Sequence, residues 1–323
     1  MRYAMNRRNF LAGSAAAAAA AATVAFAGGR LQAAPWKTTL HKSLIGSPTE
    51  PTLRSWKDAG FEGMESDAWD VTPAVAEQGR KIAEKLGMRI HAVLFGWANF
   101  NQKESVEGDI AHVQTALRAS QAYGADALLL VPCRIGNIAA PQPWEFEIAF
   151  DEKTNRISKV VAGDNSPYKD YIEAHNQAID TSREAVKRLI PTAEKTGVVI
   201  ALENVWNGLW VKPAVFANFI RTFDHPLVQC YFDIGNHVKY AMPEEWIRAL
   251  GKLIVKCHVK DFKLNADGHG GNFCDIRDGS VDWPLVRKEL DKLDYNGWMT
   301  IEGSGGLSLV ERNKRLDLID AGK

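Results

Sequence analysis

The chain has 323 residues, of which 46% are hydrophobic and 24% are charged, a composition typical of a globular domain with a substantial core. Lys and Arg together number 39, as do Asp and Glu, so the formal net charge is zero. A protein that binds nucleic acid usually carries a basic excess or stripe, and this sequence has neither, so nucleic acid is not an expected partner.

Residues 1–34 are expected to be an export segment and linker outside the fold. Arg7 and Arg8 precede a Phe-Leu pair, an alanine-rich stretch follows, and residues 25–27 read Ala-Phe-Ala, a small-x-small cleavage pattern. This order resembles a twin-arginine export signal, which implies a periplasmic or otherwise exported protein. The alternative is an N-terminal anchor helix, but alanine is too weakly apolar to make a good bilayer span. We therefore expect no membrane span in the mature protein.

From residue 35 onward, strand and helix patterns alternate, which is typical of an α/β fold with a parallel sheet and crossover helices. The predicted strands of the first half span residues 38–45, 60–65, 88–95 and 126–132. The predicted helices of the first half span residues 50–59, 73–86, 106–123 and 169–196. The last of these helices is stopped by Gly197, since glycine readily takes the left-handed conformation that ends a helix.

The second half continues the pattern with four more strands. Three of them end at Glu203, Asp233 and Glu302, and the one between carries His258; the intervening helices begin after Pro213, near Pro243 and around Trp283. About eight β/α units predict a single-domain (β/α)₈ TIM barrel over residues 35–323, with an open doubly wound sheet as the alternative. No GxGxxG or GxxxxGK[ST] motif follows an early strand, which weakens a nucleotide-binding version of that alternative.

Two segments break the alternation. Residues 133–168 are irregular and contain three prolines, and because long loops in compact domains are usually functional, we expect an excursion over the barrel mouth. Residues 265–280 contain Gly268, Gly270 and Gly271 and are expected to form a mobile loop. The four cysteines show no paired spacing, so we expect free thiols.

Glu203, Asp233, His258 and Glu302 are the candidate metal ligands of the chain. In a barrel, the carboxyl ends of the strands converge on one mouth, so these four side chains are expected to meet. Three carboxylates and one imidazole suit a divalent ion, with Mn²⁺ the first choice and Mg²⁺, Co²⁺ or Zn²⁺ as alternatives. Each residue alone has an ordinary explanation, such as a helix cap, a salt bridge or a core histidine. Their occurrence in consecutive units favours a metal site, because a shared cation satisfies all four.

Several stretches of the second half resemble one known superfamily. They are LIPTAEKTGVVIALENVWN, YFDIGNHVKY, KCHVKDF, GSVDWPLV and YNGWMTIEGSG. These are similar to the sugar phosphate isomerase/epimerase superfamily, which includes xylose isomerase-like barrels, ketose 3-epimerases and hydroxypyruvate isomerase-like proteins. The resemblance runs from about residue 37 to the end of the chain and is strongest over residues 185–303. It implies a TIM barrel, one divalent metal ion, a small sugar substrate and a homo-dimer or tetramer.

The resemblance also implies roles for individual residues. Glu203, Asp233, His258 and Glu302 match the four metal ligands of the superfamily, and Glu203 and Glu302 match the pair that also moves the proton. A cation that chelates a carbonyl and the neighbouring hydroxyl acidifies the adjacent C–H bond, so a cis-enediolate can form. Two carboxylates on opposite faces then allow epimerisation, whereas return of the proton to the neighbouring carbon gives aldose–ketose isomerisation. The sequence leaves both outcomes open.

Other activities start from the same residues or the same fold. A metal-dependent lyase or dehydratase acting on a keto-sugar, a keto-glycoside or an inositol-type substrate would use the same first step. Phosphodiester cleavage of the endonuclease IV type needs several more histidine ligands, and only eight histidines occur in the chain. A non-catalytic sugar-binding protein would not require both Glu203 and Glu302. Export favours a free sugar, a keto-sugar or an oxidised glycoside over a phosphorylated metabolite.

Candidate substrate contacts surround the predicted metal ligands. The set comprises Asn204, Asn207, Asn236, His237, Lys260, Trp206, Glu65, His91 and Arg277. Asn236 stands where ketose 3-epimerases carry a substrate-binding histidine, and His237 follows it, so substrate contact at this position departs from the family pattern. Lys260 is a candidate for substrate oxygens, with a surface salt bridge to Asp261 as the alternative. Trp206, like Trp97 and Trp210, is a candidate for stacking on a sugar ring, with ordinary packing as the alternative.

The remaining candidates are less closely tied to the metal ligands. Asn204 and Asn207 are expected beside the metal shell or against a substrate hydroxyl. Glu65 and His91 come at the ends of the second and third strands and are expected at the far end of the pocket. Arg277 is a candidate for binding an anionic or hydroxyl-rich group.

Overall fold

A computed structural model describes residues 36–323 of the chain. The predicted export segment, residues 1–34, lies outside the described residues. Within residues 36–323, no helix combines the length and the apolar character needed to cross a membrane.

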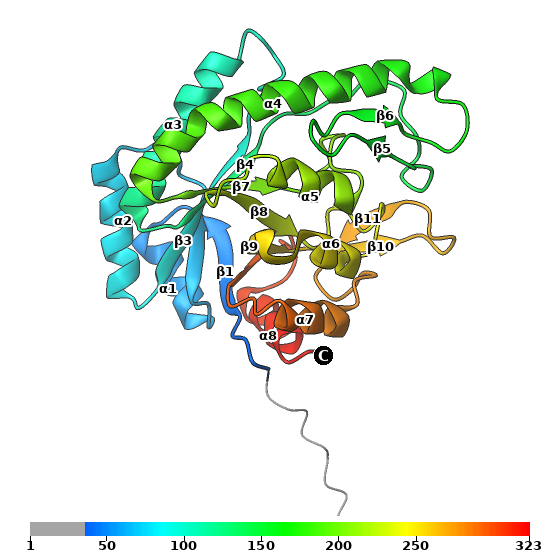
Figure 1. The fold of residues 1–323 in the computed structure, drawn as a ribbon. Coiled ribbons are helices and arrows are strands. Elements are labelled where there is room, and N and C mark those ends of the chain that lie inside the picture. Colours follow the sequence, from blue (N-terminus) through cyan, green and yellow to red (C-terminus); the bar gives the residue numbers. More distant parts are fainter. Residues whose placement is uncertain (1–35) are drawn as a thin grey trace, which may run out of the picture. The chain divides into compact units, whose positions relative to one another are not determined.

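Eight parallel strands form a closed barrel (Figure 1). In chain order the strands are β1 (His41–Gly46), β2 (Gly63–Ser66), β3 (Arg89–Trp97), β4 (Ala127–Val131), β7 (Val199–Glu203), β8 (Val228–Asp233), β9 (Ile254–Val259) and β12 (Trp298–Ile301). Each strand pairs with the next in this order, and β12 pairs with β1 to close the barrel. The predicted (β/α)₈ barrel is confirmed, and the open sheet is excluded.

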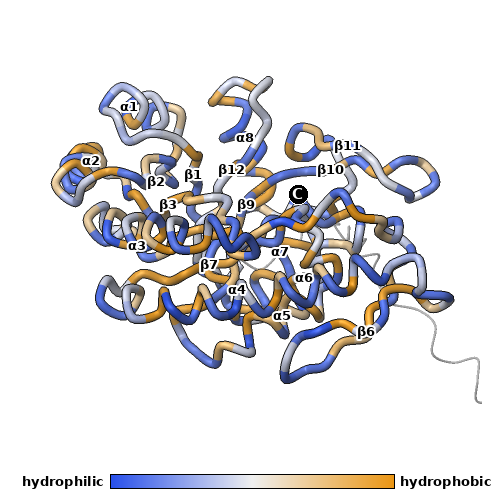
Figure 2. Tube along the Cα trace, turned by 90° about the horizontal axis from the view of Figure 1, so that it is seen from above, coloured by the Kyte–Doolittle hydropathy of each residue, from blue (hydrophilic) through white to orange (hydrophobic). Residues whose placement is uncertain are grey.

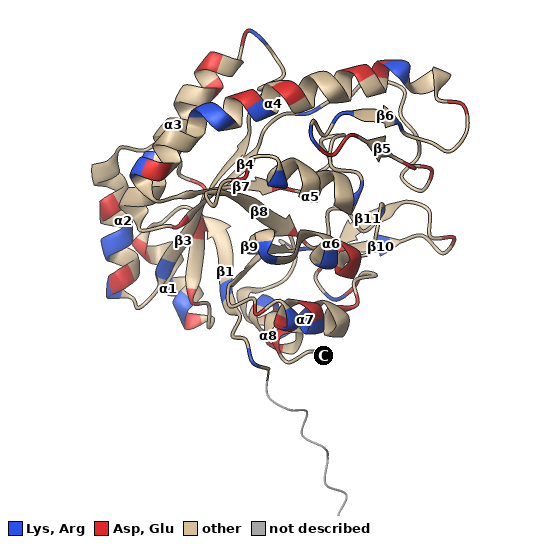
Figure 3. Ribbon diagram, in the orientation of Figure 1, with Lys and Arg blue, Asp and Glu red and all other residues tan. Residues whose placement is uncertain are grey.

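Eight helices pack around the strands (Figure 1). They are α1 (Glu50–Asp58), α2 (Pro73–Lys85), α3 (Val106–Tyr123), α4 (Lys169–Thr196), α5 (Pro213–Arg221), α6 (Pro243–Leu250), α7 (Trp283–Lys292) and α8 (Leu309–Asp320). Thr49 and Thr72 cap the first turns of α1 and α2, and Gly197 ends α4 with a φ of 69°. Hydrophobic and hydrophilic residues alternate along the helices in Figure 2, because one face of each helix packs inward. Figure 3 shows basic and acidic residues interspersed on the helices.

The main hydrophobic core lies between the strands and the helices, whereas a smaller cluster fills the barrel interior. The interior cluster consists of three alanines, two larger aliphatic side chains and one tyrosine: Ala92, Ala127, Ala201, Leu129, Val131 and Tyr231. The four cysteines are free thiols, as expected, and three of them are buried. Small residues in the interior leave room for polar side chains above them.

The segment from 133 to 168 follows β4 and contains a short antiparallel hairpin, β5 (Ala149–Phe150) with β6 (Ile157–Lys159). It packs through a separate small core in which its residues Phe146 and Val160 meet Tyr171 of α4. Figure 1 places this hairpin on the same side of the molecule as the hairpin that follows β9. The ring of Trp144 stacks on His269 at 4.2 Å between centroids, so the two excursions touch.

The prediction of a loop over residues 265–280 is partly wrong, because residues 271–274 form a strand of a hairpin. Strands β10 (Asp261–Leu264) and β11 (Gly271–Cys274) pair antiparallel, and the glycines lie in and beside the turn. The buried carboxylate of Asp261 anchors the following residues, since it accepts hydrogen bonds from the backbone N–H of Arg277 and Gly279 and from the indole of Trp283. The prediction rested on the glycine content of this stretch. The hydrogen bonds of Asp261 that anchor the stretch are tertiary contacts, so the local sequence does not reveal them.

Candidate metal centre

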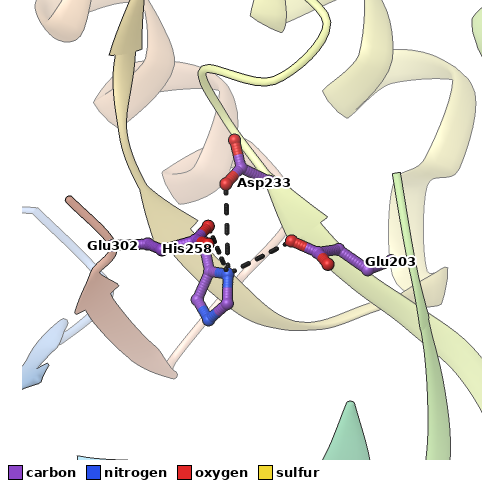
Figure 4. Close-up of side chains that lie close together, drawn as sticks. All are labelled: Glu203, Asp233, His258 and Glu302. Carbon is purple, nitrogen blue, oxygen red and sulfur yellow. Dashed lines mark hydrogen bonds and ion pairs between the residues drawn. The ribbon is translucent and has the colours of Figure 1, made fainter. Parts of the chain in front are cut away.

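Four side chains converge at the carboxyl ends of β7, β8, β9 and β12. Glu203 and Asp233 are the last residues of their strands, His258 is the penultimate residue of β9, and Glu302 directly follows β12. One ligand atom from each side chain lies within 4.8 Å of all the others. Nδ1 of His258 is 3.3 Å from Oε1 of Glu203, 3.3 Å from Oε2 of Glu302 and 3.9 Å from Oδ2 of Asp233 (Figure 4).

The carboxylate of Asp233 is oriented so that one oxygen accepts backbone hydrogen bonds and the other accepts none within residues 36–323. Its Oδ1 accepts hydrogen bonds from the backbone N–H of Gly235 at 2.8 Å and of Asn236 at 2.6 Å. Its Oδ2 is buried and has no hydrogen-bond partner among the described residues. Asn204 holds the same strand end, because its amide both accepts from and donates to the Asp233 backbone, at 2.7 Å and 2.8 Å. The free oxygen points into the cluster.

This donor set fits one divalent cation. Two ligands on opposite sides of an ion with bonds of about 2.1 Å lie about 4.2 Å apart, close to the spread of the four ligand atoms. Three carboxylate oxygens and one imidazole nitrogen suit Mg²⁺, Mn²⁺, Co²⁺ or Zn²⁺. Burying the carboxylates of Glu203 and Asp233 beside the partly exposed Glu302 is costly without compensating positive charge, and a ligand bond would account for Oδ2 of Asp233, which has no hydrogen-bond partner among the described residues. Glu203, Asp233, His258 and Glu302 would hold the ion.

The surroundings shift the pKa of every member of the cluster. Burial raises the pKa of Glu203, and it raises the pKa of Asp233 to about 7 against the attraction of Lys260. Burial works against the charge of Glu302 as well, but His258 and Lys260 hold its pKa below the usual range. Burial alone would lower the pKa of His258, yet the nearby carboxylates, Glu65 first, hold it well above its usual value. The raised pKa values of Asp233 and His258 favour their protonated forms.

Lys260 contacts the cluster from its outer side. Its Nζ lies 2.6 Å from Oε2 of Glu302 and 3.5 Å from Oδ2 of Asp233, and it donates a hydrogen bond to Oδ1 of Asn236 at 3.1 Å. Asn236 in turn reaches the backbone oxygen of Asn204 at 3.1 Å. The proposed alternative of a Lys260–Asp261 salt bridge does not occur. Lys260, Asn204 and Asn236 therefore lie beside the cluster, and their role as substrate contacts stays a prediction.

A cleft of about 500 Å³ opens beside Glu302 and is lined by Lys260, Phe273, Cys274 and Asp275, with Gly303 and Ser304. The side chain of Glu302 is 33% exposed, whereas those of His258 and Asp233 are buried. Phe273 on β11 stacks against Trp206 at 4.9 Å between centroids, and both rings are partly exposed. Exposed aromatic rings next to a polar cluster form a surface suited to the C–H face of a sugar. Phe273 was not predicted, because an isolated aromatic residue in a glycine-rich stretch carries no signal.

Two predicted substrate contacts lie inside the barrel rather than at the far end of a pocket. Glu65 and His91 are both fully buried. Glu65 accepts a hydrogen bond from Nε2 of His258 at 2.7 Å, on the side of the ring away from the cluster. His91 stacks on Trp298 at 4.3 Å and is hydrogen-bonded to Ser43 at 2.7 Å. The expectation is corrected for both, since their side chains point into the interior and have no exposed surface that a substrate can contact.

Three other residues predicted to contact substrate, Asn207, His237 and Arg277, lie away from the cluster. Asn207 is buried and shapes its own turn, because its side-chain oxygen accepts the backbone N–H of Leu209 at 2.9 Å. His237 is buried against Trp246, and burial lowers its pKa to about 3, so it is neutral. Arg277 is exposed and contacts Asp261 only through its backbone N–H. None of these three side chains reaches the cluster.

Of the predicted tryptophans, only Trp206 lies beside the cluster. Its indole N–H donates to the backbone oxygen of Asn236. Trp97 is partly exposed, with the guanidinium of Arg134 4.0 Å above its ring. Trp210 is fully buried between Phe216 and Phe219, which is ordinary core packing.

A family model for xylose isomerase-like TIM barrels matches residues 53–316. The chain belongs to this family. None of the curated protein sequences compared with the chain matches it. The match covers the barrel from α1 to α8, including all four members of the cluster.

Solved structures of the xylose isomerase-like barrel are similar to the chain over most of its length. The 3-keto-D-glucoside 4-epimerase of E. coli shares 13% identity at a TM-score of 0.62, covering 87% of this chain and 99% of that chain. Mannonate dehydratase of Streptococcus suis shares 16% identity at a TM-score of 0.63, covering 88% and 94%. A barrel protein of Mycobacterium smegmatis in complex with magnesium shares 17% identity at a TM-score of 0.58, covering 88% and 98%. At sequence identities this low, the structural similarity establishes a shared fold and not a shared activity.

Metal binding by this xylose isomerase-like barrel is expected to weaken as the pH falls. A cation must displace the proton of His258 and meets a protonated Asp233 below pH about 7, because the pKa of each group is raised. Affinity for Mn²⁺ should therefore drop by about tenfold per pH unit below neutrality for each proton displaced. Calorimetric titration with Mn²⁺ at several pH values checks this, and an affinity that does not change with pH would contradict it.

Proposed function

We propose that the protein is a divalent-metal-dependent isomerase or epimerase of a sugar or keto-sugar. The observation that carries the proposal is the placement of Glu203 and Glu302, which approach the cluster from opposite sides with His258 between them (Figure 4). Two carboxylates that flank one cation can act on the same substrate carbon from two faces.

The residues of the chain divide the chemistry among them. The bound cation supplies Lewis-acid polarisation of a substrate carbonyl. Glu203 is buried and Glu302 borders the cleft, so a substrate that enters from the cleft reaches the cluster from the side of Glu302. One carboxylate removes the proton from the carbon next to the carbonyl, which leaves the cis-enediolate of the substrate. When the opposite carboxyl group is protonated and delivers its proton to the same carbon from the other face, the product is an epimer; when the first carboxylate returns its proton to the neighbouring carbon, the product is an isomer.

Lys260 and the aromatic pair supply binding. The ammonium group of Lys260 lies 2.6 Å from Glu302, where it can donate to substrate oxygens and keep Glu302 ionised. Phe273 and Trp206 offer partly exposed rings beside it. A neutral, hydroxyl-rich ring with one keto group matches these donors, acceptors and apolar faces. We further propose that the protein acts after export, on the basis of the twin-arginine motif at Arg7 and Arg8.

A metal-dependent lyase or dehydratase is the second candidate. It starts with the same proton removal and then needs an acid that protonates a leaving oxygen. Lys260 is placed for that role, because its Nζ is hydrogen-bonded to Asn236 and lies at the cleft. One of the structural relatives is named as an epimerase and another as a dehydratase, so the fold accommodates both reaction types.

Solvent exchange tests the proposed function. The protein is incubated with Mn²⁺ and a panel of ketoses, aldoses and 3-keto-glycosides in deuterated water, and the products are followed by NMR and mass spectrometry. We expect deuterium at the carbon next to a carbonyl, together with an epimer or isomer of unchanged formula apart from that deuterium. Loss of water or of an aglycone would replace this proposal by the lyase, and absence of exchange from every class would contradict both.

A further inference from the structure

The two ring nitrogens of His258 face different neighbours. Nδ1 faces the three carboxylates of the cluster, at 3.3 to 3.9 Å. Nε2 faces the interior of the barrel and lies 2.7 Å from Oε2 of Glu65, a residue of β2. Strands β2 and β9 are not neighbours in the sheet, so this contact crosses the inside of the barrel. The imidazole therefore bridges the cluster and a buried carboxylate.

Glu65 is itself held in place from β8. The hydroxyl of Tyr231 donates a hydrogen bond to Oε2 of Glu65 at 2.6 Å, and both residues are fully buried. The ring of Tyr231 also lies 4.4 Å from the ring of His258, between centroids. Tyr231 further contacts Thr300, at 3.4 Å between the hydroxyl oxygens. One carboxylate oxygen thus meets two donors, the imidazole Nε2–H and the phenol O–H.

We propose that Glu65 and Tyr231 are positioning residues of the metal centre, which hold the imidazole of His258 with Nε2 protonated and Nδ1 presented to the cation. Fixing the far ring nitrogen selects the tautomer and the ring orientation, and a carboxylate partner increases the basicity of the ligating nitrogen. This inference rests on the metal centre of the proposed function. It assigns Glu65 an action through His258 and no contact with substrate.

Simple packing does not account for this arrangement. A buried carboxylate is costly unless it is paired, and the other oxygen of Glu65, Oε1, has no hydrogen-bond partner among the described residues. An apolar residue at this position would fill the interior at less cost, but it would leave Nε2 of His258 without an acceptor. The fold keeps a carboxyl group where it contacts the far ring nitrogen of His258.

Substitutions at Glu65 and Tyr231 test the proposal through metal binding. Glu65→Gln keeps the shape and removes the charge, and Tyr231→Phe removes only the hydroxyl that orients Glu65. We expect Glu65→Gln to weaken Mn²⁺ binding by about 10- to 100-fold, and Tyr231→Phe to weaken it by a smaller factor. Ser43→Ala is the matched control, because Ser43 is equally buried in the barrel and bonds to His91 and Thr300 but does not touch His258.

Two readouts separate positioning from a general loss of structure. Mn²⁺ affinity is measured by competition with a chelator, alongside the unfolding midpoint of each chelator-treated variant. The Nε2–H proton of His258 is followed by NMR in the Zn²⁺-loaded protein, where a downfield resonance in the wild type should move upfield in Glu65→Gln and stay in place in Ser43→Ala.

Each outcome decides the proposal. Wild-type affinity in both folded variants, or an unchanged Nε2–H resonance in Glu65→Gln, would overturn the positioning role and leave the metal centre standing. If Glu65→Gln does not fold, the affinity of Tyr231→Phe decides the positioning role in the same way. A wild-type protein that binds no divalent ion would instead overturn the metal centre and this inference together.

Discussion

Replacing Glu302 by Gln is expected to reduce solvent deuterium incorporation into substrate by at least about 100-fold. The amide cannot accept the proton that the carboxylate takes up, while its size preserves the packing against Lys260 and the cleft. The fold should be retained, so the circular dichroism spectrum should match the wild type; because Glu302 is also one of the four residues that would hold the ion, exchange is compared at saturating Mn²⁺. Exchange is measured by NMR under the conditions that give turnover with the wild-type protein.

A control variant separates this effect from a change of surface charge. Glu194→Gln alters an exposed carboxylate on α4 that pairs with His225 and not with a member of the cluster, and it should leave exchange at the wild-type rate. If Glu302→Gln exchanges as fast as the wild type, Glu302 does not move the proton and the paired-carboxylate mechanism is wrong.

Replacing His258 by Ala is expected to abolish metal retention and also to destabilise the fold. The variant loses the nitrogen ligand, so metal content measured by elemental analysis should fall from about one ion per chain to near zero. It also leaves Glu65 as a buried carboxylate without its partner, and removal of one member of a buried pair typically costs about 3–5 kcal/mol of unfolding free energy.

The two effects of His258→Ala can be separated by a second change. In the double variant Glu65→Gln with His258→Ala, the buried charge is gone, so part of the unfolding free energy should return while metal retention stays absent. His175→Ala removes another fully buried histidine, one that contacts a backbone oxygen instead of carboxylates, and should retain the metal. Undiminished metal content in His258→Ala would contradict the ligand assignment.

The barrel and the four convergent residues were predictable from the sequence because they follow from strand periodicity. Each apolar run ends in, or carries near its end, a polar side chain of metal-binding type, and the carboxyl ends of barrel strands necessarily meet. That local pattern places Glu203, Asp233 and His258 without knowledge of any distant contact. The helices were equally predictable from the sequence, since prolines and capping residues mark where they begin and glycines mark where they end.

The residues that support the cluster were not predictable in the same way. Glu65 lies almost two hundred positions before His258, and their contact depends on side chains that point into the closed barrel from strands that do not pair. Asn236 and His237 show that even adjacent residues cannot be assigned a direction from sequence alone. Asn236 contacts Lys260, whereas the side chain of His237 packs in the core. Asp261 anchors a hairpin through bonds to residues up to twenty-two positions later.

Anomalous diffraction from crystals grown with Mn²⁺ tests the central claim most directly, because it locates the ion itself. We expect one strong peak between Glu203, Asp233, His258 and Glu302, with bonds of about 2.0–2.3 Å to Nδ1 of His258 and to one oxygen of each carboxylate. The peak should lie beside Oδ2 of Asp233, the oxygen that has no hydrogen-bond partner among the described residues. A protein saturated with Mn²⁺ that shows no peak at this position, or shows its peak elsewhere, would contradict the account.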